Sequence, residues 1–264
     1  MNTKLKTVGL LLGCIITLSV RAYPADWNPL AAGGTDTLGF FVNEIKANPE
    51  PLQTPRPARR LIAIDPGHPS SFNSGSAVIN GTTEGHINWV VALKLQALLI
   101  SSGVDAVLVK SSEMQLVENK ERARIANRAG ADLTVHLHCD AGTHSGFAIY
   151  YPDRRGVHTY KDDPENGFSG PSKAVLTGSS ALGKAVFNGM SGVLAGKLRG
   201  TLRTDFQSLV GSRQGALATS IFSEIPTVTI EMAVLTNYSD ALFLKSEQGQ
   251  ELMAKAIAAG ILKY

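Results

Sequence analysis

Cysteine is nearly absent from this chain: Cys14 and Cys139 are the only two among 264 residues. So few cysteines exclude the disulfide framework that stabilises many small secreted domains. An excess of charge is also lacking, because residues 1–22 hold three basic and no acidic residues and the remainder holds 22 of each sign. A general basic field that would attract nucleic acid is therefore excluded. Hydrophobic residues make up 44% of the chain, which is enough for one sizeable core.

A hydrophobic run long enough to cross a bilayer as a helix is missing as well. The apolar run near the N-terminus extends over only 13 residues, from Val8 to Val20. Two lysines precede it, and Val20-Arg21-Ala22 follows with the small-x-small pattern typical of signal cleavage. We therefore predict that residues 1–22 are a signal peptide. The protein is expected to be exported to the periplasm or cell wall, with no stable membrane insertion once the signal has been removed.

Leu11-Leu12-Gly13-Cys14 permits a second interpretation, because it resembles the lipobox of bacterial lipoproteins, in which the cysteine is acylated. The residues after Cys14 remain apolar, whereas a lipoprotein continues into a polar tether, so simple cleavage is favoured. Cleavage would remove Cys14 and leave Cys139 without a partner for an intramolecular disulfide.

Proline divides the mature chain into two parts. Six prolines fall between residues 23 and 58, where their fixed φ angles and missing N–H donors disfavour a regular core element. We predict a proline-rich N-terminal arm over residues 23–58, with one short helix over residues 38–46. A single compact domain is expected over residues 59–264.

Strand and helix patterns alternate along this domain. Strands are predicted over residues 61–65, 106–109, 133–138, 146–151 and 227–232, and helices over residues 84–101, 117–129, 180–199 and 249–263. Such alternation predicts an α/β fold, a single three-layer domain in which helices flank a mostly parallel or mixed sheet. Residues 152–180 are rich in glycine, proline and charge, which indicates a surface insertion bordering any groove.

Four polar residues fall at or near the ends of predicted elements. His68 follows the first strand, His138 ends the third, Glu231 lies near the end of the late strand, and Glu84 opens the first helix. Ligands in open α/β sheets bind beyond the carboxyl ends of the strands, so these residues are expected at one edge. Imidazole and carboxylate suit zinc, and a catalytic zinc keeps three protein ligands. His68, Glu84 and His138 would supply such a set.

Each of these residues also has a structural interpretation. His68 can close a Pro-Gly turn, and Glu84 is favoured in a first helical turn by the helix dipole alone. His136 shares a strand face with His138 and is the next choice as a ligand. Cys139 is expected on the opposite face and is rejected.

Glu231 lies in a buried strand, where an unpaired carboxylate is costly. Either a salt bridge to Arg213 or Arg122, or a role as general base beside a metal-bound water, would satisfy it. Asp65 is a turn residue or a partner that orients a ligand. His86 and His144 are expected to be exposed, with either able to touch a substrate.

Four blocks of the sequence together resemble a known family: IAIDPGH with His68, TTEGHINW with Glu84, ANRAGADLTVHLHCDAG with His138, and PTVTIEMAVLTN with Glu231. Over residues 61–264 they are similar to the zinc-dependent N-acetylmuramoyl-L-alanine amidases of bacterial cell walls. The resemblance implies one zinc ion held by His68, Glu84 and His138, and a catalytic Glu231. It also implies a sheet of about six strands.

The implied activity is hydrolysis of the amide between the lactyl group of muramic acid and L-alanine, with peptidoglycan as the partner. The chain departs from the family where it reads His-Leu-His-Cys-Asp in place of Ser-Ile-His, and where Pro-Ser-Ser follows the first histidine block in place of glycine. The block after Glu231 also differs. These departures bear on substrate preference and leave the ligands in place.

Two other functions remain open. The chain can be an exported zinc hydrolase of a different amide or peptide bond, or a non-catalytic module that binds the cell wall. Retention of all four polar groups favours an enzyme over a binding module. Either reading allows a protein activator, which no motif in the sequence identifies.

Overall fold

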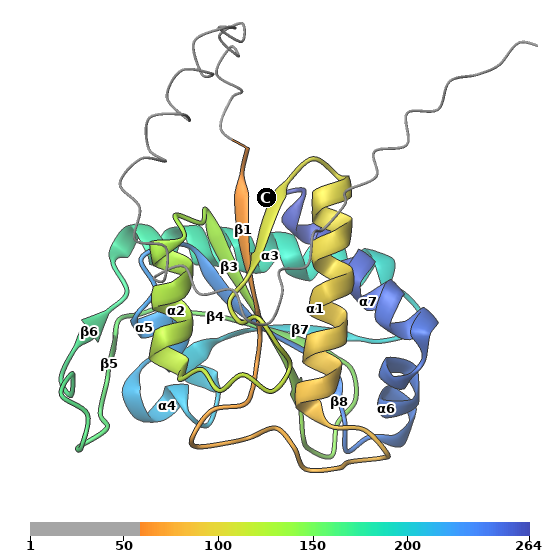
Figure 1. Ribbon diagram of the computed structural model, residues 1–264, viewed down its shortest axis with the longest axis horizontal. Helices are drawn as coiled ribbons and strands as arrows, with labels where there is room; N and C mark the ends of the chain where they lie inside the picture. Colours follow the sequence, from red (N-terminus) through yellow and green to blue (C-terminus); the bar gives the residue numbers. More distant parts are fainter. Residues whose placement is uncertain (1–58) are drawn as a thin grey trace, which may run out of the picture. The chain divides into compact units, whose positions relative to one another are not determined.

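A computed structural model describes residues 59–264 of the chain (Figure 1). The expected signal peptide, the proline-rich arm and the short helix over residues 38–46 lie outside these residues. Among the helices of residues 59–264, none is both long and apolar enough to cross a membrane.

Six strands form one mixed sheet in the order β2-β1-β3-β8-β4-β7. They are β1 (Leu61–Pro66), β2 (Asp105–Leu108), β3 (Leu133–Asp140), β4 (Phe147–Tyr151), β7 (Gly200–Thr204) and β8 (Thr227–Val234). Four of them, β2, β1, β3 and β8, are parallel, whereas β4 is antiparallel to β8 and parallel to β7. A separate hairpin pairs β5 (Gly156–Val157) with β6 (Ser169–Gly170). The predicted α/β fold with a six-stranded mixed sheet is confirmed.

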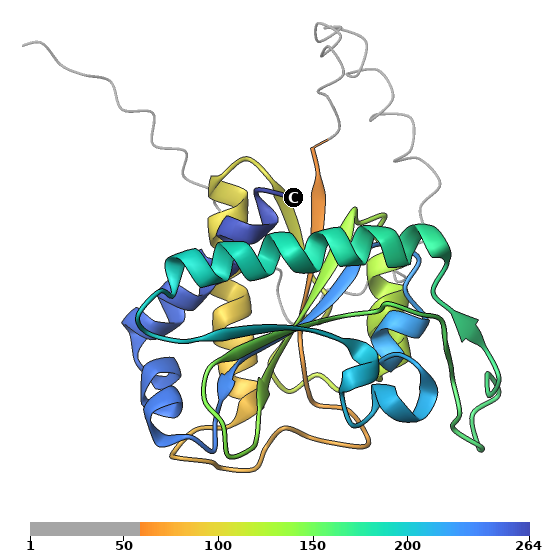
Figure 2. The same ribbon diagram turned by 180° about the vertical axis from the view of Figure 1, so that it is seen from behind.

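Seven α-helices flank the sheet within the described residues. They are α1 (Glu84–Ser101), α2 (Asn119–Arg128), α3 (Lys173–Val193), α4 (Gly211–Gln214), α5 (Ala218–Ile221), α6 (Tyr238–Lys245) and α7 (Glu247–Ile261), with a 3₁₀ turn at Asp205–Gln207. Helices α1 and α2 lie on opposite sides of β1 and β3 (Figure 1), and the long helix α3 runs across the sheet (Figure 2). This is the expected three-layer arrangement.

Alternation along the strands divides the core between the two faces. Ile62 and Ile64 are fully buried in the larger cluster, which includes side chains of α1, α3, α6 and α7. Ala63 lies in a smaller cluster with Ala126 of α2. Small side chains on this second face bring α2 close to β1, which positions polar residues of the helix beside the turn after β1.

The boundaries of the helices follow their capping residues. Helix α1 spans the predicted residues, and Thr83 caps it by accepting a hydrogen bond from the His86 N–H (3.2 Å). Helix α3 begins at Lys173, where the Ser172 hydroxyl accepts from the Val175 N–H, and ends at Val193. The predicted helix over residues 180–199 therefore starts and ends earlier in the structure than predicted. The surface insertion, predicted to reach residue 180, ends at residue 172. Strand β7 and helix α6 were not predicted.

Arg122 of α2 is a buried cation whose two terminal nitrogens are directed at the end of β1 and the turn after it, while its Nε donates to the Val117 carbonyl (2.9 Å). Its Nη1 donates to Asp65 Oδ1 (2.6 Å) and to the Pro66 carbonyl (2.9 Å), and its Nη2 donates to the Pro69 carbonyl (2.9 Å). Burial alone would raise the pKa of Asp65, but Arg122 and His136 outweigh it and hold that pKa well below its usual range. A buried ion pair of this kind is stable only while both partners remain.

Replacing Arg122 with alanine is expected to lower the free energy of unfolding by about 3–5 kcal/mol, because Asp65 would stay buried without a counter-charge. Arg128→Ala is the matched control on the same helix. Its ion pair with Glu121 is exposed, so the loss should be about 1 kcal/mol or less. Urea unfolding followed by circular dichroism measures both, and equal losses would contradict this account.

Candidate metal centre

The carboxyl ends of three neighbouring parallel strands place the candidate residues at one edge of the sheet. His68 follows β1 through the Pro66-Gly67 turn, and His138 and Glu231 are partners in the register between β3 and β8. Adjacent strands lie about 5 Å apart, so the last two side chains are neighbours on the same face. Glu84, in the first turn of α1, approaches from the loop that follows β1.

His68, Glu84 and His138 form a cluster whose ligand atoms all lie within 4.8 Å of one another. Glu84 is central: Oε2 is 3.1 Å from His68 Nε2, and Oε1 is 3.0 Å from His138 Nδ1. The backbone N–H of Cys139 also donates to Glu84 Oε1 (3.1 Å). The two imidazole rings stand nearly perpendicular, with centroids 5.0 Å apart. A single carboxylate thus bridges two histidines from different strands.

The backbone around His68 is fixed by contacts with distant residues. His68 has φ of 63°, a left-handed conformation that is uncommon for a residue with a side chain. Lys110, at the end of β2, donates from Nζ to the His68 carbonyl. The Nδ1–H of the His68 ring donates to the Asn73 carbonyl (3.0 Å). This second bond leaves Nε2 directed at Glu84, as required of a metal-binding histidine.

Gly67 allows the His138 ring to close on the turn. A Cβ atom built on Gly67 would lie 2.4 Å from His138 Cε1 and 2.5 Å from Nε2, distances that no side chain can adopt. The Gly67 carbonyl also accepts a hydrogen bond from Asn88 Nδ2 (3.2 Å), a buried residue of α1. The glycine of the Asp-Pro-Gly-His block is therefore required for close approach.

Electrostatics within the cluster favour a charged carboxylate between the rings. Burial would raise the pKa of Glu84, but hydrogen bonds with His138 and His68 outweigh it and hold that pKa well below its usual range. Burial lowers the pKa of His138, and Glu84 offsets this only in part. His68 behaves oppositely, because its bond to Glu84 outweighs burial and raises its pKa.

Glu231 is an uncompensated acid beside this cluster. Burial, followed by the nearby carboxylates of Glu84 and Asp140, raises its pKa well above the usual value. Its Oε2 atom is buried without a hydrogen-bond partner, and among residues 59–264 it makes no ion pair. The salt bridge considered for it, with Arg213 or Arg122, is not formed, since Arg122 pairs with Asp65.

The other histidines and Cys139 lie outside the cluster. His136 is buried, with Nδ1 bonded to Asp65 Oδ2 (2.7 Å) and Nε2 bonded to Thr227 Oγ1 (2.8 Å), so both ring nitrogens are already engaged. Cys139 joins the core on the opposite face, as expected from alternation. His86 and His144 have half-exposed side chains that pair with Glu113 and Asp140.

Three residues that support the cluster were missed or misassigned from the sequence. Lys110 and Asn88 were not considered, although Lys110 follows a strand that ends at the same edge. Arg122 was considered only as a partner of Glu231. Asp65, for which a turn role and an orienting role had both been left open, orients His136 and Arg122. Asp65 affects the position of His68 only indirectly, because it pairs with Arg122, which in turn holds the turn that carries His68.

The cluster has the properties of a cation site. Two imidazoles and one carboxylate suit a borderline-soft divalent ion such as zinc. The short contacts between Glu84 and the two rings join the same atoms that would hold the ion, and a metal displaces protons from its ligands when it binds. The unpartnered Glu231 Oε2 adds a buried acceptor at the adjacent position. The residues present therefore fit a zinc ion.

Comparison with known proteins is consistent across sequence and structure. A family model described as N-acetylmuramoyl-L-alanine amidase matches residues 62–263. The N-acetylmuramoyl-L-alanine amidase AmiA of Salmonella typhimurium is 25% identical over 223 residues, covering 78% of this chain and 76% of that protein. The structure of amidase AmiC2 of Nostoc punctiforme has a TM-score of 0.60 and 27% identity, covering 78% of this chain and 97% of that one.

A third comparison bears on the fold alone. The CwlD amidase of Clostridioides difficile, solved in complex with the GerS lipoprotein, has a TM-score of 0.58 at 24% identity. It covers 78% of this chain and 98% of that chain.

Alanine at position 68 or 138 is expected to lower zinc affinity by more than about 100-fold, because loss of a ligand should cost at least as much as loss of a residue that only orients one. His86→Ala removes an exposed imidazole two residues from Glu84 and should leave zinc affinity unchanged. Competition with a chromophoric chelator, with elemental analysis after dialysis, gives both values. Equal zinc affinity in the three variants would contradict the assignment.

Proposed function

The chain belongs to the N-acetylmuramoyl-L-alanine amidase family, and from this membership we propose that it is a zinc-dependent hydrolase of the amide joining the lactyl group of muramic acid to L-alanine in peptidoglycan. One observation carries the zinc-dependent part of the proposal. The ligand atoms of His68, Glu84 and His138 lie within 4.8 Å of one another, and Glu231 is in register beside His138. This arrangement supports a site with three metal ligands and one free acid at the same edge of the sheet.

The metal would be held by His68, Glu84 and His138. A zinc ion bound there supplies Lewis acidity, which lowers the pKa of a water molecule and polarises the amide carbonyl. His68 would offer its Nε2 to the ion, because its Nδ1–H is already bonded to the Asn73 carbonyl. Lys110 and Arg122 hold the turn on which His68 lies. The chain therefore prepares the three ligand positions before the substrate arrives.

Glu231 is proposed as the group that moves the proton. Its carboxylate would accept the proton of the attacking water and deliver it to the nitrogen of the departing L-alanine. Burial favours the neutral form of Glu231, and positive charge beside a carboxylate favours the ionised form. A cation held by the neighbouring ligands would therefore favour the ionised form of Glu231, which is the form that can act as a base.

We propose that the exported protein acts on peptidoglycan outside the cytoplasm. The N-terminal signal pattern supports action in the periplasm or cell wall, and the names of the relatives support peptidoglycan as the substrate. A protein partner that regulates this chain is a further proposal; the CwlD amidase, which shares the fold, was solved in complex with the GerS lipoprotein.

Purified peptidoglycan digested with the protein should yield peptides with a free L-alanine amine and glycans with a free lactyl carboxyl group, which mass spectrometry identifies. A metal chelator should abolish the digestion, and added zinc should restore it. Products cleaved at a different amide would replace the amidase with another zinc hydrolase. Binding to the wall without cleavage would replace it with a binding module.

Glu231→Gln should lower the rate of digestion by about 10²–10⁴-fold while zinc content stays at one ion, because the amide cannot accept the proton of the water. The control is Glu251→Gln, an exposed acid of α7, which should digest at the wild-type rate. Rates are measured by release of soluble fragments from labelled sacculi. Digestion by Glu231→Gln at the wild-type rate would exclude Glu231 as the base.

A further inference from the structure

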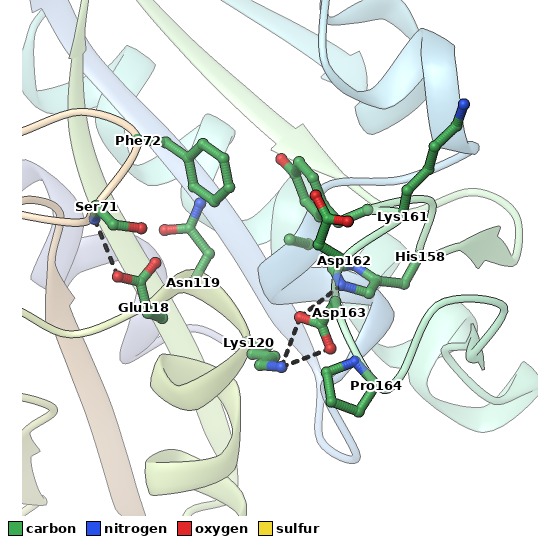
Figure 3. A pocket seen from close by; sticks show the side chains of 12 residues that line it. Ser71, Phe72, Glu118, Asn119, Lys120, His158, Lys161, Asp162, Asp163 and Pro164 are labelled. Atoms are coloured by element: carbon green, nitrogen blue, oxygen red, sulfur yellow. Dashed lines mark hydrogen bonds and ion pairs between the residues drawn. The ribbon is translucent and has the colours of Figure 1, made fainter.

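One cavity of the molecule has no part in the proposed reaction. It is a cavity of about 480 Å³ between the loop after β1, the N-terminal end of α2 and the 152–172 insertion (Figure 3). We call it the α2 cavity. Its lining includes Phe72, Glu118, His158, Tyr160 and Asp162. Segments far apart in the sequence build it, which is typical of a binding pocket.

Ion pairs hold the insertion against α2 and so fix the shape of the α2 cavity. Lys120 Nζ lies 2.6 Å from Asp163 Oδ2 and 3.2 Å from Glu165 Oε2. Arg124, one turn further along α2, also pairs with Glu165. Several charges in one network give more rigidity than an isolated surface pair. The far wall of the cavity is therefore anchored to the helix and through it to the sheet.

One wall of the α2 cavity is aromatic. Phe72, from the loop after β1, stacks on Tyr160 of the insertion with ring centroids 5.0 Å apart and an interplanar angle of 24°. Phe72 remains 71% exposed, which is unusual for so large an apolar side chain. Exposed aromatic rings attract both an aliphatic stem and a cation placed over a ring face.

Among the groups of residues 59–264 that line the α2 cavity and make no ion pair, two are acidic and one, Lys161, is basic. Asp163 is compensated by Lys120, but within residues 59–264 neither Glu118 nor Asp162 makes an ion pair. They lie on opposite sides of the cavity, and the Lys161 ammonium group extends away from it (Figure 3). Two uncompensated carboxylates beside an aromatic wall favour a ligand with a positive charge on an apolar stem.

His158 gives an independent sign of a ligand. It lines the α2 cavity, is only 2% exposed, and has its Nε2 atom 3.2 Å from Asp163 Oδ2. Neither ring nitrogen has a hydrogen-bond partner of standard geometry, and Nδ1 has no ion-pair partner either. A buried ring nitrogen without a partner is rare in proteins. A ligand N–H group, directly or through one water, would satisfy it.

The α2 cavity lies within reach of a peptide that starts at the metal centre. Phe72 follows His68 by four residues, and four residues span at most about 14 Å when extended. A peptide leaving the scissile amide covers the same distance with its first four residues. The cavity can therefore receive a side chain from the third or fourth residue of a wall peptide.

Resting on the proposed function, we propose that the α2 cavity binds the free side-chain ammonium group of a diamino-acid residue in the peptide of the substrate. Glu118 and Asp162 would face the charge, and Phe72 and Tyr160 would contact the stem. Crosslinking of peptidoglycan acylates this amine, which removes its charge and two of its three donors. The α2 cavity would therefore favour uncrosslinked peptides over crosslinked ones.

Calorimetry with the mature chain tests this without any hydrolysis. The probes are the tripeptides L-Ala-γ-D-Glu-L-Lys and L-Ala-γ-D-Glu-meso-diaminopimelate, each with its side-chain amine free or acetylated. The free forms should bind at least about tenfold more tightly, as expected for hydrogen bonds to a charged group. Asp162→Asn should abolish most of that difference. Asp105→Asn, an exposed acid at the start of β2, should preserve it.

Equal affinity for free and acetylated peptides, no binding of either, or an unchanged preference in Asp162→Asn would each overturn the proposal. A parallel digestion of sacculi distinguishes failure of this proposal from failure of the proposed function. Preference for free amines without any cleavage would leave the α2 cavity as a binding site and reject the amidase. Cleavage without that preference would keep the amidase and reject the α2 cavity as the site that binds the amine.

Discussion

The buried pair of Arg122 and Asp65 is the interaction on which the candidate metal centre depends. Arg122 approaches from α2 and donates to the carbonyls of Pro66 and Pro69, which lie on either side of the turn that carries His68. Its charge is balanced by Asp65, which His136 also contacts. A helix on one face of the sheet thereby shapes a turn at the edge. Lys110, Asn73 and Glu84 make further contacts with His68, but none of them holds the carbonyls of Pro66 and Pro69.

Parallel pairing supplies the rest of the site. Because β1, β3 and β8 run in the same direction, their carboxyl ends lie at one edge, and residues as far apart in sequence as His138 and Glu231 become neighbours. Glu84 completes the group from the first turn of α1, where the helix dipole already favours a carboxylate. Each ligand thus lies on a regular element or directly beside one, which gives the positional accuracy that a catalytic metal requires.

The parts of the fold with strong periodicity could be predicted from the sequence. The central strands and α1 have continuous apolar runs or clear helical spacing, and they were located to within a few residues. Strand β7 was missed because its five residues, Gly-Thr-Leu-Arg-Thr, carry little apolar signal and gain stability only by pairing with β4. The early start of α3 was missed because a serine cap was read as loop composition.

The candidate ligands were predictable for a different reason. Strand direction forces the ends of β1, β3 and β8 to one edge, so the polar residues there could be named before any geometry was known. The supporting residues Lys110, Asn88 and Arg122 could not be predicted. They donate to backbone carbonyls, and every residue has a carbonyl, so the sequence does not show which ones accept these hydrogen bonds. The choice of His138 over His136 rested on one strand position, and the hydrogen bonds of His136 supply the physical reason for it.

The bridge made by Glu84 between His68 and His138 has a consequence for chain topology. An ion held by these residues would join positions 68, 84 and 138 at one point, closing loops of about 15 to 70 residues. A covalent cross-link closing loops of that length stabilises a fold by roughly 3–5 kcal/mol through the entropy of the unfolded chain. Residues 59–264 contain one cysteine, which is buried and unpaired, so the ion would take the place of a disulfide. Unlike a disulfide, such a metal cross-link can be removed by a chelator without breaking a covalent bond of the chain.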